Sequence, residues 1–254
     1  LGDRRLRRDE CSGARVAVIF ELGPPLRVIA LRGQESRRYA RGFVSGPSGS
    51  FAGTEHAGRQ SGIQMNLTLP GAALLFGVPL SEYFGRALPL AFEELLPAER
   101  DLSERLFHAG DSSANPWPAR FAVLLEWLRG RLAVGQPLLA QPGFHAVQAV
   151  LASMERGESS VNDFADQLGY SRKHLTALFR RFAGAAPGTI QRLQRFASLL
   201  DVLRAESRAD RKSAAQIALD CGYYDQSHCI REVRAWSGTT PGALPELLST
   251  RLVG

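Results

Sequence analysis

The chain has 254 residues, of which 44% are hydrophobic and 22% are charged. These fractions are typical of a globular protein and exclude a disordered chain, and the length is enough for two domains that each bury a core. No apolar run approaches the roughly 18 residues of a membrane span, and the first residues lack the apolar core of a secretory signal. The chain has three cysteines, and an odd number in a chain too large to need disulfides indicates reduced thiols. We therefore expect a cytoplasmic protein without a membrane segment.

The net charge is +6, and positive charge is concentrated in one part of the chain. Residues 167–200 contain no acidic side chain but carry six cations. These cations are Arg172, Lys173, Arg180, Arg181, Arg192 and Arg195. Such a segment is attracted to nucleic acid or to an anionic membrane, or it is simply a solvated basic face.

Residues 1–110 are predicted to form a β-rich sensor or interaction domain. Short runs rich in β-branched and aromatic residues are separated by Gly, Pro and Ser, which favours a barrel or sandwich. The runs are ARVAVIFEL, LRVIAL, RGFVSG and SGIQMNLTL, which begin at residues 14, 26, 41 and 61. After Pro70 the pattern changes to short helical turns. The expected fold class is α+β with two domains, a β-barrel or cupin-like domain with an apolar interior and then an all-α domain.

Residues 111–143 are predicted to be a linker that contains one amphipathic helix over residues 119–134. Apolar side chains recur there at helical spacing, at Phe121, Leu124, Leu125, Leu128 and Leu132. The helix either packs within the chain, which we favour, or pairs with a second copy. The segment GQPLLAQPG, residues 135–143, is rich in helix breakers and ends the linker. Residues 144–254 have a helical pattern throughout.

This C-terminal part contains an internal repeat. Residues 160–170 align with 213–223, and 171–188 align with 225–242, with Tyr224 as a one-residue insertion. Nine of 29 aligned positions are identical, whereas background frequencies predict roughly two. The identical pairs include Gly169 with Gly222 and His174 with His228. One structural unit is therefore present twice.

Each copy is predicted to be a helix-turn-helix. Ser160 and Ser213 are placed to cap a first helix, and Gly169 and Gly222 then supply the positive φ of a sharp turn. The second helices have apolar faces that are predicted to be buried, made of Leu175, Leu178, Phe179 and Phe182 in one copy and Cys229, Ile230, Val233 and Trp236 in the other. Two helices joined by a tight glycine turn form a helix-turn-helix, which binds DNA through its second helix. A helical repeat that binds protein is the alternative, although solenoids usually need at least three units.

The segment between the copies is predicted to be a helical rod. Ile190, Leu193, Phe196, Leu200 and Leu203 recur at helical spacing. Roughly 15 residues would span about 22 Å. Such a rod can hold two recognition helices about 34 Å apart, so that both enter successive major grooves on one face of the DNA.

With these two units, the chain resembles the C-terminal domain of AraC/XylS-type transcription regulators. The resemblance covers residues 144–247, and its most specific parts are GYYDQSHCIREVRAWSGTTPG and FADQLGYSRKHLTALFRRFAG, which begin at residues 222 and 164. The N-terminal part resembles more loosely the β-barrel-like domains that precede this module, through PGAALLFGVP from residue 70. Cys229 and Val233 depart from the family, which usually has Phe there, and we expect Trp236 to fill the space.

The resemblance implies a bacterial, sequence-specific transcription factor that binds double-stranded DNA in the cytoplasm. Its expected partners are RNA polymerase and a small-molecule effector at the N-terminal domain, and it would act as a monomer or a homodimer. Activation and repression both stay open. No cofactor is expected.

The family pattern also implies the contacts that each helix makes. Base-reading residues are expected on the exposed faces of the two recognition helices, at Lys173, Thr176, Ala177, Gln226, Ser227, Ile230 and Arg231. Phosphate contacts are expected from nearby cationic and histidine side chains, at Arg172, His174, Arg180, Arg181, His228 and Arg234.

Catalytic and metal sites are not expected. Cys221, His228 and Cys229 lie close in the sequence, but no Cys-x-x-Cys pair is present, and adjacent helical residues point away from each other. No Gly-x-Ser-x-Gly or Gly-Lys-Ser/Thr motif occurs. The alternative to a regulator is a small-molecule-binding barrel protein or an enzyme that carries a helical protein-interaction module.

Overall fold

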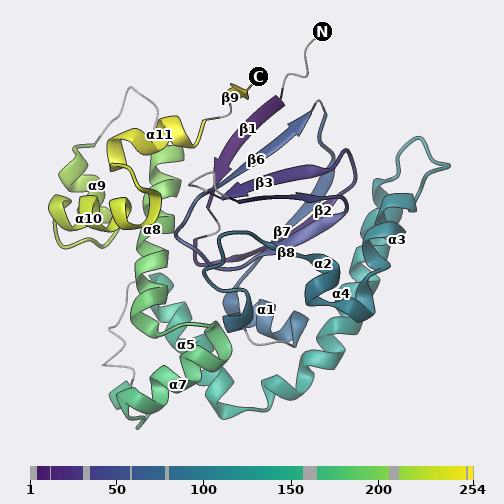
Figure 1. The fold of residues 1–254 in the computed structure, drawn as a ribbon. Helices are drawn as coiled ribbons and strands as arrows, with labels where there is room; N and C mark the ends of the chain where they lie inside the picture. Colours follow the sequence, from purple (N-terminus) through teal and green to yellow (C-terminus); the bar gives the residue numbers. More distant parts are fainter. Residues whose placement is uncertain are drawn as a thin grey trace.

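A computed structural model describes residues 5–11, 13–30, 35–57, 59–77, 80–156, 165–205, 212–249 and 251–253. The expected fold class is confirmed: strands in two antiparallel sheets are followed by a helical C-terminal region (Figure 1). In the described residues the two sheets do not close into one barrel. None of the helices in the described residues has the length and apolarity to cross a membrane.

The first sheet has the strand order β4-β3-β6-β1-β9, and the second has the order β7-β2-β5-β8. The strands are β1 (Arg5–Glu10), β2 (Val16–Glu21), β3 (Leu26–Ala30), β4 (Ser36–Tyr39), β5 (Gly42–Ser45), β6 (Ala52–Ala57), β7 (Gly62–Leu67), β8 (Leu90–Ala91) and β9 (Arg251–Val253). Strand β9 pairs antiparallel with β1, so the end of the helical region extends an N-terminal sheet.

The second sheet buries one of its faces against helices. Val16, Val18 and Phe20 alternate along β2 and are fully buried, as expected of a strand with one face on a core. Phe20 makes edge-on ring contacts with Phe92 and Trp127 at centroid distances of 5.0 and 6.3 Å. Five short helices and one long helix, α4, complete this region: α1 (Leu69–Phe76), η1 (Leu80–Glu82), α2 (Phe92–Leu95), η2 (Pro97–Glu99), α3 (Leu102–His108) and α4 (Trp117–Leu139).

Helix α4 differs from the sequence prediction in its length and in its packing. It continues to Leu139, through the segment that was predicted to break it. Gly135 lies against α1 so closely that a Cβ there would be 2.3 Å from the Leu74 carbonyl oxygen, so this glycine permits close packing and does not end the helix. Leu124 is buried, but Phe121 and Leu125 are 48% and 49% exposed. Packing within the chain therefore covers only part of the apolar face.

The C-terminal helices are α5 (Pro142–Arg156), α7 (Arg172–Ala183), α8 (Pro187–Ala205), α9 (Ala214–Asp220), α10 (Gln226–Ser237), η3 (Pro241–Ala243) and α11 (Leu244–Leu247). Helix α8 is the predicted rod; α7 lies at its lower end and α10 lies beside its middle and upper part (Figure 1). With 19 residues, α8 spans about 28 Å, longer than the prediction because it begins at Pro187.

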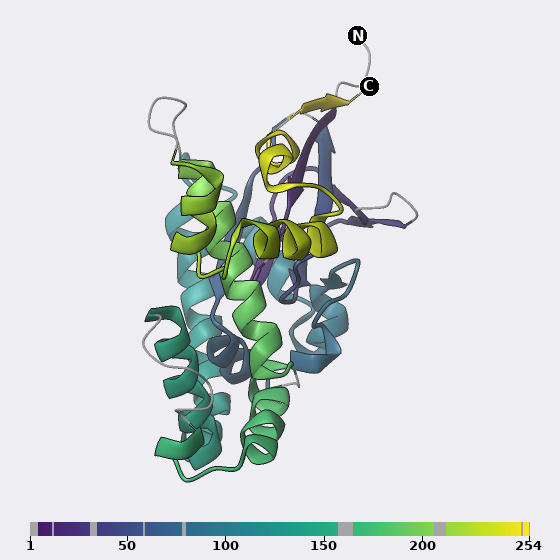
Figure 2. The same cartoon turned by 90° about the vertical axis from the view of Figure 1, so that its left-hand side faces the viewer.

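The two regions pack directly on each other (Figure 2). One apolar cluster joins β2 and α1 to α5, α7 and the start of α8, and includes Phe144, Phe179 and Ile190. A second cluster joins Phe51 to α8, α9 and α10, with the rings of Phe51 and Phe196 edge-on at 6.1 Å. The helical region is therefore held by shared cores as well as by the chain connection.

Gly135→Ala should destabilise the protein by about 1–3 kcal/mol, because the new methyl group overlaps the Leu74 carbonyl and pushes α4 away from α1. Gly130→Ala is the matched control in the same helix, since a Cβ at Gly130 meets nothing within 4 Å. The control should be neutral or stabilising by up to about 1 kcal/mol. Urea unfolding measures both changes, and equal effects of the two substitutions would contradict the packing role of Gly135.

Candidate nucleic-acid interface

The first helix-turn-helix unit has the glycine turn that the sequence predicts, and its second helix begins at a serine cap that was not predicted. Gly169 adopts φ +66°, and the Tyr170 N–H donates to the Ala165 carbonyl across the turn at 2.8 Å. The Ser171 side chain caps α7 by accepting from the His174 N–H at 3.2 Å. The start of the first helix, with Ser160, Val161 and Phe164, lies outside the described residues.

The second unit repeats this geometry. Gly222 adopts φ +80°, and the Tyr223 N–H donates to the Ala218 carbonyl at 3.0 Å. Ser213 caps α9, as predicted, by accepting from the Gln216 N–H at 3.2 Å. Asp225 caps α10 by accepting from the His228 N–H at 2.6 Å. The described part of the first unit thus has the same turn and the same capped second helix as the second unit. The first unit adjoins the start of α8, and the second packs along its middle and C-terminal half.

The repeated tyrosines and histidines have a packing reason. The Tyr170 and His174 rings meet edge-on at 4.8 Å, and the Tyr223 and His228 rings do the same at 5.5 Å. In each unit the tyrosine follows the turn and the histidine lies in the first turn of the second helix. The pair therefore fixes where the recognition helix starts relative to the turn.

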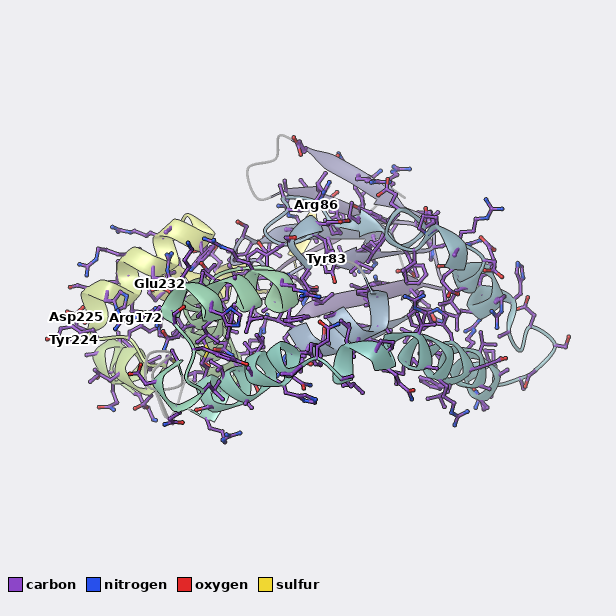
Figure 3. All side chains as sticks on the ribbon, turned by 90° about the horizontal axis from the view of Figure 1, so that it is seen from below. Tyr83, Arg86, Arg172, Tyr224, Asp225 and Glu232 are labelled. Atoms are coloured by element: carbon purple, nitrogen blue, oxygen red, sulfur yellow. The ribbon has the colours of Figure 1, made fainter. Side chains whose placement is uncertain are left out.

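The expected base-reading side chains are mostly accessible. The exposed ones are Lys173, Ala177, Gln226, Ser227 and Arg231, whereas Thr176 and Ile230 are half-buried. Figure 3 shows Arg172 of α7 and Tyr224 and Asp225 of the second unit on the same side of the molecule, the side on which Figure 1 places α7 and α10.

The expected phosphate contacts divide into two groups. Arg172, Arg180 and Arg234 are exposed, as is His174. Arg181 is exposed as well, but it donates to the Gln141 side chain at 3.0 Å, and its guanidinium lies 4.8 Å from the centroid of the Phe182 ring. His228 is also held by internal partners, because its Nδ1 accepts from the Tyr224 N–H at 3.3 Å.

The core of the second unit explains how Cys229 and Val233 are accommodated. Both are buried in the cluster that contains Phe51 and Phe196, so a phenylalanine from α8 and one from the N-terminal domain supply volume there. Burial raises the pKa of the Cys229 thiol to about 11. Trp236 packs against this cluster and lies on Gly49 of the N-terminal domain, where a Cβ would be 2.2 Å from the indole ring.

Sequence reasoning missed one charged residue of the second recognition helix, Glu232. Its side chain is 3% exposed and forms ion pairs with Arg195 and Arg192 of α8, at 3.1 and 3.5 Å. Two cations of the acid-free segment are therefore paired with a carboxylate 37 or more residues away. The available signal was a glutamate at the helical spacing of the buried positions Cys229 and Val233.

In the described part of the chain, Arg172, Lys173, Arg180 and Arg231 form no ion pair, so their charges remain available to a polyanion. No group of three or more His, Cys, Asp or Glu side chains among the described residues is placed to hold a metal ion.

Residues 164–246 match the family model of the helix-turn-helix domain, in its AraC-type form. None of the curated proteins matches the chain. Among solved structures, ToxT from Vibrio cholerae is similar over 96% of this chain and 94% of its own, at 8% identity and a TM-score of 0.46. A structure of Vibrio cholerae ToxT bound to (E)-4-(8-methylnaphthalen-1-yl)but-3-enoic acid is similar over 96% of this chain and 95% of its own, at 9% identity and a TM-score of 0.47. The match in sequence and the geometry of the two units agree: residues 164–246 form a helix-turn-helix domain of the AraC type.

Proposed function

We propose that this protein is a sequence-specific transcription regulator that reads two successive major-groove segments with α7 and α10. The observation that carries the proposal is the presence of two units on one 19-residue helix, the first at its start and the second along its middle and C-terminal half. In both units the second helix is capped and has exposed polar side chains. A rod of about 28 Å suits recognition helices that enter the DNA one helical turn, about 34 Å, apart. A single chain would then read about two turns without a twofold partner.

The chemistry of the exposed side chains supports different roles for the two helices. On α10, Arg231 can pair bidentately with guanine and Gln226 with adenine. On α7, Lys173 can bind guanine, and the methyl group of Ala177 suits a thymine methyl. Arg172, Arg180 and Arg234 are suited to phosphate, which positions the protein without reading sequence.

Selection of bound duplexes from a random DNA library tests this function, and it should return one enriched site with two parts. On that site Arg231→Ala should cost about 1–3 kcal/mol and relax the preference at one base pair, because a base contact is lost. Arg180→Ala is the comparison and should weaken binding to all sequences alike. No enriched site, or a uniform loss for Arg231→Ala, would contradict the proposal.

The proposed effector site is a cavity of about 780 Å³ between the two sheets. Its size lies in the range of small-molecule sites. Ala197, Leu200 and Arg204 of α8 line it together with strand residues, so an occupant would touch the rod that carries both DNA-binding units. The walls are mixed rather than apolar as expected, with Thr54, Gln64 and Asn66 beside Ile19, Val28 and Phe43. An effector there could shift DNA affinity by the 1–3 kcal/mol that is typical of coupled sites.

Ala17→Trp places an indole in this cavity, since Ala17 lines it, and should displace a bound small molecule. Native mass spectrometry of protein purified from its host should show an added small-molecule mass on the wild type that is absent from the variant. DNA binding by the variant serves as the control for folding. Identical spectra for the two proteins would argue against an effector at this place.

The dimer alternative gains support from α4. Phe121, Leu125, Leu128, Leu132 and Leu139 follow one another at intervals of four, three, four and seven residues, and all but Leu128 are exposed by about two fifths or more. This is the spacing of the seam between two paired helices. We propose a homodimer in which the α4 helices of two copies pack together.

Leu125→Glu should shift the protein toward the monomer in sedimentation experiments, because the new charge lies in the seam. Ala133→Glu is the matched control, since Ala133 is exposed on α4 but lies outside the stripe. A wild type that sediments as a monomer at all concentrations would rule out the dimer. Equal shifts by both variants would show that the apolar stripe of α4 is not the contact between the two copies.

A cytoplasmic location and a contact with RNA polymerase follow from this function and are part of the proposal. The second candidate, a small-molecule-binding protein with a helical protein-interaction module, is favoured by the cavity alone. Loss of DNA binding combined with retention of a small molecule would support it.

A further inference from the structure

We propose that Glu232 is a positioning residue that sets the orientation of the second recognition helix on DNA. The proposal rests on the proposed function, because it concerns how α10 reads bases. It starts from an unusual observation, a nearly inaccessible carboxylate on the helix that carries Gln226, Ser227 and Arg231. Burying a carboxylate is costly unless it is paired and hydrogen-bonded.

The partners of Glu232 come from two helices. Arg195 of α8 donates from Nη2 to both carboxylate oxygens, at 3.1 Å to Oε2 and 3.4 Å to Oε1. Arg192, one turn earlier on α8, has its Nε 3.5 Å from Oε1. Each arginine also lies over an aromatic ring of the second unit, Arg195 over Tyr223 at 5.6 Å and Arg192 over Trp236 at 5.1 Å. The carboxylate is thus held to the rod from two successive turns.

His228 joins the turn of the second unit to the same carboxylate. Its Nδ1 accepts from the Tyr224 N–H, so the ring proton of the neutral imidazole is on Nε2. Nε2 lies 3.2 Å from Glu232 Oε2. The backbone of the inserted residue Tyr224, the first turn of α10 and the middle of α10 are therefore connected to α8 through one buried group.

This connection controls the rotation of α10 about its own axis. The other buried side chains of α10 are Cys229, Val233 and Ser237, all of them small, and the Ser237 hydroxyl donates within α10, to the Val233 carbonyl. A rotation of about 20° would move a side-chain atom 5–6 Å from the helix axis by about 2 Å. Arg231 follows Glu232 directly in the chain, and its paired hydrogen bonds to a base would not survive such a displacement. Glu232 therefore acts on recognition through Arg231 without touching DNA.

The test measures base discrimination rather than affinity alone, on the site enriched by the wild-type chain. Arg231→Ala and Lys173→Ala first identify the base pairs that α10 and α7 read. Glu232→Gln, which keeps the size of the side chain and weakens its bonds to Arg195, should lower discrimination about tenfold at the base pairs read by α10. Discrimination at the base pairs read by α7 should stay within about twofold of the wild type.

Glu246→Gln is the matched control, because it removes one negative charge from an exposed position of α11 in the same unit. It should change affinity for all sequences alike. A second variant, Arg195→Met with Glu232→Met, replaces the buried pair by apolar side chains, which usually preserves the fold. It should keep the wild-type melting temperature to within a few degrees and show the same loss of discrimination.

If Glu232→Gln or the double variant is folded and discriminates like the wild type, the positioning role is overturned. A purely structural role would lower the fraction of active protein or its melting temperature while leaving the ratio between correct and mismatched sites unchanged. Failure of the wild type to enrich any site is a separate outcome, which contradicts the proposed DNA-binding function itself.

Discussion

The arrangement of the whole molecule depends on the burial of helix α8. Its apolar side chains enter both main clusters: Ile190 belongs to the one that contains the second sheet and α7, and Phe196, Leu199 and Leu200 belong to the one that contains α9 and α10. Because an α-helix is stiff and rises 1.5 Å per residue, the distance between the two units follows from which residues of α8 each unit contacts. A flexible linker between the same units would leave that distance undefined.

The same helix connects three features that lie apart in the sequence. Ala197, Leu200 and Arg204 line the cavity between the sheets, and Arg192 and Arg195 hold Glu232 on α10. The N-terminal domain also contacts this region through Phe51 and through Gly49 beneath Trp236. A ligand bound in the cavity would therefore contact α8, which in turn contacts the second recognition helix directly. A change in the N-terminal domain would reach the first unit through α1 and η1, which both pack on α7, with Leu80 close to Gly184.

Features that depend on local chemistry were predictable from the sequence. The positive φ of Gly169 and Gly222 and the cap at Ser213 follow from short-range rules and agree with the structure. The two-domain fold class and the helix-turn-helix domain were also predictable, since the repeated pattern is strong. The roles of individual base-reading and phosphate-binding residues stay predictions.

Features that depend on contacts between distant residues were not predictable. From the sequence, Gly135 is interpreted as a helix breaker, because its contact with Leu74 of a distant helix is not visible there. Arg192 and Arg195 are likewise interpreted as unpaired cations, because Glu232 lies 37 or more residues away in the chain. Similarly, the helical spacing of Phe121 and Leu125 indicates a helix but not which part of its apolar face the rest of the chain covers. Strand β9 pairs with β1 although the two strands lie near opposite ends of the sequence, and no local sequence pattern predicts this pairing.

The central claim is that α8 holds two recognition helices at a fixed separation on one face of the DNA. Base- and phosphate-interference footprinting of the full chain on its selected site measures this directly. The account predicts two contacted major-groove segments whose centres lie about 10 base pairs apart, with the Arg231→Ala variant losing contacts in one segment alone. A single contacted segment, or two segments on opposite faces of the duplex, would contradict it.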